Sequence, residues 1–560
     1  MLKTFPTLVL LLSALPILSV CAQTPTPGAG VPGPAVDTVH GSHHAAALDA
    51  TQLAAALDNL LNTHDTAKRT NVTLVVRDLE TGDTLYNRGG DKLLTPASNL
   101  KIYTAAAAID LLRPDYTWTT GITLPTFRGS PDVPPNQAAI LVATGDPMFD
   151  TEQFNALVDQ LEPEQLRETP IVAVGMSSPK RWRDVPLKGP GWMWDDDPDY
   201  YNMSIRAGML NFNVVEVSVT PDGDAFDIEV IREPFRRSTA AGFEMMLGTE
   251  TPNHVRVTLD PPAAYPVVPR HGSSAEMSFG LVGPGSKLFD FNDRYPFSIT
   301  RKPFEDDLTI TGFMKPDAEP VYARLTVHDP AEWIPAVMAD RLETQGMPIQ
   351  LEHDTIQYFN SDSFREQLVA EQQGKPLSEA VQHFLRVSEN AVGEMLLLHL
   401  AEKFDEDGEV SWPAGAKVIS DWLVNEAGVE EGSFRLVDGS GLSRYNLISA
   451  NSSIELLDHM DDHEHFAVFF DGLPVYKVAL PEQERWSGVP LAEFEVERVF
   501  AKPGGMSGVN TISGYLDTLD GRRLAFSLLA NGYIGSSAPV RDLRGRVWST
   551  LVRYRAGDAE

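Results

Sequence analysis

The two ends of this chain carry one kind of pattern and the long middle region carries another. Apolar residues recur at helical spacing near both ends, over residues 48–63, 95–112, 376–404, 411–428 and 540–557. Alternating apolar residues predict strand pairs at 71–89 and 511–533. Between them, roughly over residues 115–345, short apolar strands alternate with Pro- and Gly-rich turns. The matching ends therefore predict one mixed helix-and-sheet domain that the middle region interrupts.

This layout predicts an α+β fold, with a sheet covered by helices and split by a β-rich insert of one or two smaller domains. We expect residues 47–115 and 345–560 to be the two parts of the split domain and residues 116–344 to be the insert. Residues 23–46 are rich in Pro and Gly and predict a linker. No repeat of fixed period is present in the sequence.

The first 22 residues have the pattern of a secretory signal peptide, with a short basic start and an apolar stretch from Leu8 to Val20. Two interpretations are open: ordinary cleavage after Ala22, or a lipoprotein site at which Cys21 is acylated. Cys21 is the only cysteine, so the mature chain has no disulfide and cysteine-based catalysis or metal binding is excluded. These features predict an exported bacterial protein in the periplasm, either lipid-anchored at Cys21 or free.

The charge of the chain limits its partners. The formal net charge of −33 repels phosphate backbones, so we expect no binding to nucleic acid. No stretch after the signal peptide is long and apolar enough to span a bilayer. With 42% hydrophobic and 22% charged residues, the composition is that of a globular protein.

Ser98 and Lys101 lie three places apart at the start of the apolar run that ends at Leu112. Residues three apart share a helix face, so the amine can reach the hydroxyl. A cation on the first turn faces the positive end of the helix dipole, which disfavours it unless it has a task. We expect the dipole and other cations to lower the pKa of Lys101, and a neutral amine can take a serine proton. The alternative, a helix cap followed by a surface lysine, is open on this spacing alone.

Two more polar groups interrupt apolar segments further along the chain. Ser388 and Asn390 break a helical stretch; the hydroxyl can relay a proton, and the amide can orient a lysine or a substrate. Lys502 follows an apolar strand and precedes Gly504 and Gly505, which allow a backbone to approach a ligand closely. The strand edge there can pair with an extended peptide. The alternatives are local helix caps and a surface lysine before a turn.

In this order the three groups resemble the S-x-x-K, S-x-N and K-T-G motifs of penicillin-binding proteins and serine β-lactamases. About 290 residues separate Ser98 from Ser388, and about 114 separate Ser388 from Lys502. The long first gap is similar to that of the D-alanyl-D-alanine carboxypeptidase/endopeptidase family, peptidase family S13, the class C low-molecular-mass penicillin-binding proteins. The resemblance covers almost the whole mature chain, and the stretch 438–446 is particularly specific.

The resemblance implies an antiparallel sheet with helices on both faces and a serine-type D-Ala-D-Ala carboxypeptidase or DD-endopeptidase. The implied partners are peptidoglycan stem peptides and β-lactams, with no metal or organic cofactor. The implied nucleophile is Ser98, with Lys101 as its base. Ser388 and Lys502 would pass the proton to the leaving amine, and Asn390 would position lysine and substrate. Carboxypeptidase and endopeptidase activity, and the oligomeric state, are left open.

The third motif departs from the family, because Pro503 and Gly505 replace both threonines of Lys-Thr-Gly-Thr. The family's hydroxyls help hold the terminal carboxylate, and each lost bond to a charged group costs about 1.5–3 kcal/mol. The Gly505 N–H remains and can line an oxyanion hole with the Ser98 N–H. Either Ser507 or Arg444 takes over the carboxylate, or the substrate differs, or activity is weak. The open alternatives are a wall-binding homologue with little or no activity and a hydrolase with another substrate.

Two other clusters suggest metals but have better ordinary explanations. His459 and His463 lie four apart, with His465 close by, which suits a metal on a helix face. We expect instead an acidic, His-rich surface, because no distant further ligand is evident. The acidic stretch 194–201 lacks the spacing of a calcium loop and predicts a turn.

Overall fold

We analysed a computed structural model of the 560-residue chain. The structure describes residues 47–127, 136–162, 169–182, 184–197, 199–222, 225–231, 321–350, 356–360, 362–479 and 495–556, together with short strands between residues 257 and 311. The predicted signal peptide, Cys21 and the linker lie outside the described residues. Residues Ala45–Glu560 group into one compact unit.

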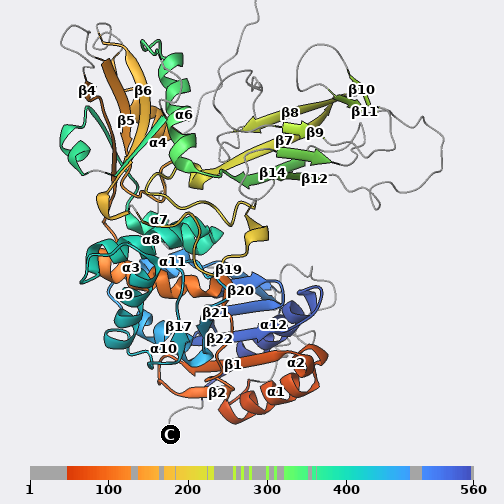
Figure 1. Ribbon diagram of the computed structural model, residues 1–560. Helices are drawn as coiled ribbons and strands as arrows, with labels where there is room; N and C mark the ends of the chain where they lie inside the picture. The colour runs from red at the N-terminus through yellow and green to blue at the C-terminus, as the bar shows by residue number, and fades with distance from the viewer. Residues whose placement is uncertain are drawn as a thin grey trace, which may run out of the picture. The chain divides into compact units, whose positions relative to one another are not determined.

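A six-stranded sheet joins the two ends of the described chain (Figure 1). Its order is β19-β20-β21-β22-β1-β2, and every neighbouring pair is antiparallel. The strands are β1 (Asn71–Asp78), β2 (Thr84–Arg88), β19 (Val475–Ala479), β20 (Glu495–Met506), β21 (Val509–Asp517) and β22 (Arg523–Asn531). Because β1 pairs with β22 from Asn71↔Asn531 to Asp78↔Leu524, the sheet needs both ends of the chain to form.

One face of this sheet is covered by helices from the two ends of the described chain. They are α1 (Ala50–Thr63), α2 (Asp65–Arg69) and α12 (Ala538–Leu551). Helix α1 begins at a capping box in which Asp49 and Gln52 satisfy each other's backbone N–H groups. Its residues Leu53 and Leu57, one helical turn apart, are fully buried in a core shared with Trp548 of α12.

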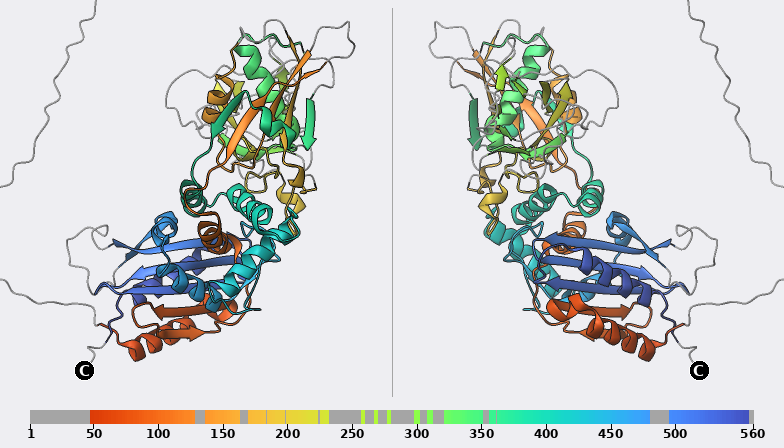
Figure 2. Two further views of the ribbon diagram at one scale, coloured as in Figure 1. Left: turned by 90° about the vertical axis from the view of Figure 1, so that its left-hand side faces the viewer. Right: turned by 90° about the vertical axis from the view of Figure 1, so that its right-hand side faces the viewer.

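The other face carries a larger helical layer, so the sheet has helices on both sides (Figure 2). These helices are α3 (Lys101–Leu112), α7 (Leu377–Val387), α8 (Asn390–Phe404), α9 (Trp412–Asn425), α10 (Ala450–Asp461) and α11 (Phe466–Gly472). Helix α3 packs against α7, α8 and α9 and is buried along its length from Lys101 to Ile109. Its run of alanines lets neighbouring helices approach closely, which places the start of α3 deep inside the molecule.

The middle of the chain forms further sheets. The largest has the order β15-β6-β5-β3-β16, with β4 paired to β5. Its strands are β3 (Thr119–Thr123), β4 (Thr126–Phe127), β5 (Asn136–Val142), β6 (Ile171–Ser178), β15 (Ile356–Asn360) and β16 (Ala370–Gln373). The pairs β5–β6 and β6–β15 are parallel. Parallel pairs need crossover connections, which contain helices α4 (Thr151–Val158) and α6 (Pro330–Thr344).

Smaller sheets complete the middle region. Three strands have the order β14-β7-β8, three have the order β12-β13-β9, and β10 pairs with β11. Their bounds are β7 (Val214–Asp222), β8 (Ala225–Ile231), β9 (Val257–Leu259), β10 (Val267–Pro269), β11 (Met277–Phe279), β12 (Ser298–Arg301), β13 (Leu308–Thr311) and β14 (Val321–Thr326). A short pair, β17 (Phe434–Arg435) and β18 (Leu447–Ile448), brackets the loop 438–446.

The predicted fold class is confirmed: an antiparallel sheet lies between helices, and a region rich in strands separates its two parts in the sequence. Helices α4 and α6 add to that middle region, where the Pro/Gly-rich pattern predicted strands alone. The domain boundaries stay a prediction. Strands β15 and β16 pair with β6 and β3, which favours an end of the insert after Gln373 rather than before Gln345. Within the described residues, no helix is long and apolar enough to cross a membrane.

Candidate active site

Ser98 lies on a short 3₁₀ helix, η1 (Ala97–Leu100), that leads directly into α3. The residue before it, Ala97, has a φ of 49°, in the left-handed region that non-glycine residues rarely adopt. Such strain persists only where the surroundings fix the backbone, and it is common at functional sites. Here the carbonyl of Ala97 packs against Gly441, where an added Cβ would lie 2.0 Å from that oxygen.

The Lys101 amine makes three short contacts on the first turn of α3. Its Nζ lies 3.0 Å from the Ser98 Oγ, 2.6 Å from the Asn390 Oδ1 and 2.7 Å from the Ser440 carbonyl oxygen. The amide and carbonyl oxygens can only accept a hydrogen bond, whereas the hydroxyl can accept or donate. A neutral amine therefore keeps two N–H bonds and turns its lone pair to the Ser98 hydroxyl.

Burial lowers the pKa of Lys101 to about 8, although nearby carboxylates, including those of Asp438 and Glu394, act in the opposite direction. The sequence predicted a lowered pKa from the helix dipole and from other cations. The main cause is instead desolvation, because the lysine is completely buried. A neutral fraction therefore exists at the pH at which most enzymes work.

Ser388 and Asn390 lie at the junction between α7 and α8. Ser388 has a φ of 67°, a left-handed conformation that ends α7 and turns the chain into α8. The Asn390 amide has a fixed orientation, because its Oδ1 accepts from Lys101 while its Nδ2 donates to the Tyr201 carbonyl at 2.7 Å. Tyr201 comes from the middle region of the chain, so that region contributes directly to the geometry around Lys101.

Lys502 brings the third motif to the same place. Its Nζ lies 2.9 Å from the Ser388 Oγ, and burial and the charge of Lys101 hold its pKa well below the usual value. The Asn99 side chain donates to the Lys502 carbonyl at 2.7 Å, which ties β20 to η1. The Lys101 amine is therefore hydrogen-bonded to both Ser98 and Asn390, and the Lys502 amine to Ser388. The charge of Lys101 also lowers the pKa of Lys502.

The stretch of β20 beside this cluster has one edge that pairs with no strand in the described part of the chain. Residues from Lys502 to Met506 pair with β21 on one side, whereas β19 pairs only as far as Phe500. Pro503 lacks a backbone N–H, and an edge strand tolerates this where a central strand does not. Neither Pro503 nor Gly505 carries a side-chain donor.

Gly504 and Gly505 differ in their surroundings. A Cβ at Gly504 would lie 2.2 Å from the Pro96 carbonyl oxygen, so η1 packs directly on this residue. A Cβ at Gly505 would meet nothing within 4 Å. The first glycine is required by close approach, whereas the second faces open space.

Arg444 and Ser507 meet at the end of β20. The Arg444 Nη1 donates to the Ser507 carbonyl oxygen at 3.3 Å, and both residues are exposed. Among the described residues, the side chains of Arg444 and Ser507 form no hydrogen bond with Ser98, Lys101 or Lys502. The geometry therefore leaves their predicted role in substrate binding as a prediction.

Two buried carboxylates, to which the sequence analysis gave no role, hold the loop that supplies the Ser440 carbonyl. Glu394 accepts from the Gly439 and Ser440 N–H groups at 3.2 and 2.9 Å and from the Trp412 indole at 2.7 Å. Burial and Asp438 raise the pKa of Glu394. The sequence contains an indication of this role, because Glu394 lies four residues after Asn390 and therefore on the same helix face.

Asp438 is the second of these carboxylates. It accepts from the Gly441 and Ser443 N–H groups, from the Asn446 amide and from the Trp192 indole. All of its partners except Trp192 lie in the stretch 438–446, which the sequence singled out as specific without indicating its task. That task is structural: the stretch folds into a loop that presents one carbonyl to Lys101.

The His-rich stretch is arranged around a contact between His463 and Asp110. His463 Nε2 lies 3.2 Å from Asp110, whose other oxygen accepts from the Trp422 indole. The rings of His459 and His463 are 5.7 Å apart. Within the described ranges, no group of three or more potential ligands is placed to hold a metal ion.

A serine hydroxyl next to a buried lysine, with a second lysine–serine pair beside it, can carry out acyl transfer without a metal. Together with a sheet covered by helices on both faces, this site defines the class of penicillin-binding proteins and serine β-lactamases. Comparison with known proteins narrows the class. The chain belongs to the D-Ala-D-Ala carboxypeptidase 3 (S13) family, whose model matches residues 53–240 and 294–547.

Individual relatives agree with this membership. The chain is 28% identical over 478 residues to a D-alanyl-D-alanine carboxypeptidase of Actinomadura sp. (strain R39), covering 82% of this chain and 78% of the relative. It is 21% identical over 493 residues to the D-alanyl-D-alanine carboxypeptidase DacB of Haemophilus influenzae, covering 86% and 91%. The fold is similar to the crystal structure of penicillin binding protein 4 (dacB) from Haemophilus influenzae, with a TM-score of 0.63 and 18% identity over 89% of this chain and 99% of that one.

Proposed function

We propose that this protein is a serine-type D-Ala-D-Ala peptidase that acts on peptidoglycan stem peptides through an acyl-enzyme on Ser98. The observation that carries the proposal is the Lys101 amine, buried and 3.0 Å from the Ser98 hydroxyl. Its other two contacts are pure acceptors, so the neutral amine has one lone pair and one hydroxyl to receive it.

In the acylation step the Ser98 Oγ attacks the carbonyl carbon of the D-Ala-D-Xaa bond as its proton passes to the Lys101 Nζ. The resulting oxyanion accepts from the N–H groups of Ser98 and Gly505. The C–N bond then breaks, and the leaving amine takes a proton from the Ser388 hydroxyl, which Lys502 replenishes. Asn390 holds Lys101 in place and binds the substrate amide.

Before deacylation, Lys101 passes the proton that it took from Ser98 to the Ser388–Lys502 pair, so that its amine is neutral again. Water then attacks the ester carbonyl and gives its proton to Lys101. The Ser98 oxygen leaves and regains its proton, and the product carries a free carboxylate. Each step moves protons between neighbouring groups, so the proposed reaction needs no cofactor. β-Lactams, which mimic the acyl-D-alanyl-D-alanine end, would acylate Ser98 in the same way.

Carboxypeptidase and endopeptidase activity both follow from this chemistry, since they differ only in what lies beyond the scissile bond. For an exported enzyme, as the first 22 residues predict, the substrate would be the periplasmic peptidoglycan. Acylation of Cys21 would anchor it at the membrane, and cleavage after Ala22 would release it.

A second candidate has a specific observation in its favour. The open edge of β20 lacks the side-chain donors with which the family's threonines hold a terminal carboxylate, because Pro503 and Gly505 take their places. A substrate without a free carboxylate at that end, such as a cross-linked peptide, an ester or an amide, would lose nothing by this change. A wall-binding protein with little activity is the limiting case.

Incubation of the full chain with a fluorescent penicillin and with muropeptides tests the proposal, with Ser98→Ala as the matched control. We expect Ser98-dependent labelling, and release of D-alanine from a stem peptide or of a monomeric stem peptide from a cross-linked one. Muropeptide cleavage with slow labelling would favour altered recognition. The absence of any Ser98-dependent turnover would contradict the enzyme and favour the binding protein.

A further inference from the structure

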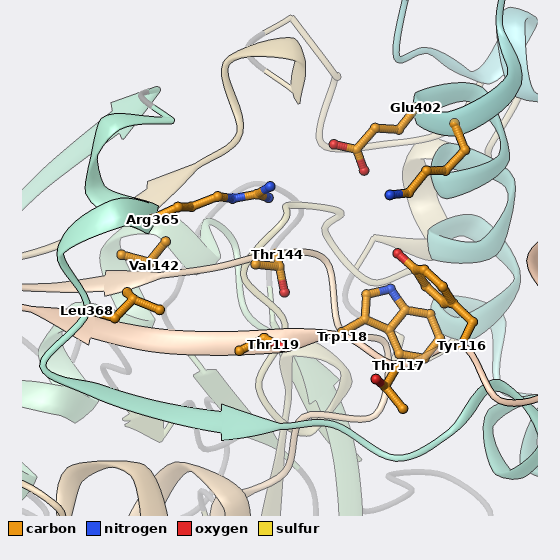
Figure 3. Close-up of a pocket in the computed structure, with 10 residues that line it drawn as sticks. Tyr116, Thr117, Trp118, Thr119, Val142, Thr144, Arg365, Leu368 and Glu402 are labelled. Atoms are coloured by element: carbon orange, nitrogen blue, oxygen red, sulfur yellow. The ribbon is translucent and has the colours of Figure 1, made fainter.

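A pocket of about 320 Å³ opens between the middle region and the end of α8. It is lined by Tyr116, Thr117, Trp118, Thr119, Val142, Thr144, Arg365, Leu368, Glu402 and Lys403 (Figure 3). Its size is at the lower end of the range for small-molecule sites in proteins. We call it the Arg365 pocket.

Two cations line the Arg365 pocket without a carboxylate partner. Within the part of the chain that the structure describes, neither Arg365 nor Lys403 has an Asp or Glu oxygen within ion-pair distance. Lys403 instead lies over the Tyr116 ring, with its Nζ 5.7 Å from the ring centre. Two such cations in one pocket are notable in a chain with a formal net charge of −33.

The single carboxylate in the pocket is already engaged. The Oε2 of Glu402 lies 3.3 Å from the Nδ1 of His399, a fully buried ring on the inner side of α8. Figure 3 shows Glu402 and Arg365 pointing toward one another from opposite walls, with open space between them. The lining therefore carries two positive groups and one negative group.

Neutral donors complete the lining. The Thr144 Oγ1 is buried and has no hydrogen-bond partner among the described residues. Burial and the charge of Glu402 raise the pKa of Tyr116 to about 12, so its hydroxyl stays protonated and free to donate. A guanidinium, an ammonium and two hydroxyls facing one space match the acceptors of a carboxylate.

The distance from the catalytic site limits what the pocket can hold. Asn390 begins α8 and Lys403 lies near its end, 13 positions further, which corresponds to roughly 20 Å along the helix axis. A peptide of four or five residues spans at most about 17 Å when fully extended. A stem peptide held at Ser98 is therefore shorter than this length of helix, so we expect any peptidoglycan carboxylate in the pocket to come from another part of the polymer.

We propose that the Arg365 pocket binds a carboxylate of a second peptidoglycan stem peptide, beside the stem that is cleaved at Ser98. The pocket would hold the polymer by its free carboxylates, which are the anions that such peptides carry. This inference rests on the proposed function for the identity of the polymer. It adds to that function a preference for substrates with more than one stem.

The test uses the full-length Ser98→Ala protein, so that binding is measured without turnover. Isothermal titration calorimetry compares two soluble fragments, a disaccharide with one stem peptide and a tetrasaccharide with two. The pocket variant is Arg365→Glu/Lys403→Glu. The matched control is Lys417→Glu/Arg546→Glu, which changes the net charge equally at two exposed, ion-paired residues outside the pocket.

We expect the pocket variant to bind the two-stem fragment about tenfold or more weakly, as the loss of charge-assisted bonds implies. Binding of the one-stem fragment, and binding by the control variant, stay unchanged. The neutral variant Arg365→Gln/Lys403→Gln should also bind the two-stem fragment more weakly, but by a smaller factor. Thermal unfolding, and penicillin labelling in the Ser98 background, verify that each variant is folded.

Several outcomes would overturn the inference: equal affinity of the Ser98→Ala protein for the two fragments, an unchanged affinity of the pocket variant for the two-stem fragment, an equal loss in the control, an equal loss for the one-stem fragment, or no binding of either fragment to the Ser98→Ala protein. Displacement of the two-stem fragment by inorganic phosphate, at concentrations where acetate has no effect, would assign the pocket to a phosphate and also overturn it. If the protein with Ser98 intact shows no turnover, but the Ser98→Ala protein still binds the two-stem fragment in a way that depends on Arg365, only the proposed enzymatic function is contradicted.

Discussion

The two sides of the active site differ in how firmly they are held. On the α3 side, the Lys101 amine has three partners within hydrogen-bond distance, and buried Glu394 and Asp438 fix the loop that supplies one of them. On the β20 side, Pro503 and Gly505 offer no side-chain donor, and no strand among the described residues pairs with the edge there. The nucleophile is thus strongly positioned, whereas recognition of the substrate is left to backbone groups and more distant residues.

This contrast separates catalysis from specificity. A chain that had lost its enzymatic task would have no need to keep a completely buried lysine, because burying an amine without function is costly. An edge stripped of donors is compatible with activity on a different acyl or leaving group. We therefore expect substitutions on the α3 side to reduce the rate on every substrate, and those on the β20 side to change which substrate is preferred.

The largest effect is expected for Lys101→Met, which keeps the length of the side chain but removes the base. Acylation of Ser98 by a penicillin should slow by about 10²- to 10⁴-fold, the usual contribution of general base catalysis. Stopped-flow measurement of labelling checks this, with Lys417→Met as the control at an exposed lysine. A change of less than about tenfold would mean that Lys101 is not the base.

A matched pair of alanine substitutions examines the β20 side. Gly504→Ala places a methyl group 2.2 Å from the Pro96 carbonyl oxygen and should displace η1, whereas Gly505→Ala places it in open space. We expect the first to lower the acylation rate by about 10²-fold, in line with the cost of overpacking a rigid site, and the second to change it little. Equal effects of the two substitutions would show that η1 and β20 are not packed as described.

Restoring side-chain donors to the edge of β20 tests whether this edge recognises the terminal carboxylate of the substrate. The double variant Pro503→Thr/Gly505→Thr should raise kcat/KM for a peptide with a free terminal carboxylate by about tenfold. The same peptide with an amidated end should gain nothing, which provides the internal control. An equal gain on both peptides would contradict the assignment of this edge to carboxylate recognition.

Much of the fold could be predicted from the sequence because the elements near the ends are locally consistent. Alternation over residues 71–89 located β1 and β2, and the helical period of 376–404 with its polar break located α7 and α8. The helices α4 and α6 were missed, since the Pro- and Gly-rich turns around them dominated the pattern. Parallel pairing, which requires such crossovers, leaves no short-range signal in a sequence.

The site shows the same division. Polar motif residues such as Ser98, Lys101 and Lys502 stand out against apolar neighbours, so the sequence could predict them as candidates. Glu394 was not, although it shares a helix face with Asn390, because a single acid on a helix is usually exposed and its burial is known only from the structure. The Tyr201 carbonyl leaves no signal at all, since every residue has a carbonyl and only the tertiary fold selects one.

The most direct test of the central claim, that the neutral Lys101 amine takes the Ser98 proton, is the pH dependence of Ser98 acylation by a penicillin. Because burial lowers the pKa of Lys101 to about 8, the neutral fraction grows as the pH rises through that value. We predict a rate that increases about fivefold from pH 7 to pH 8 and levels off above pH 9. A rate that is flat or falls over this range would contradict the account.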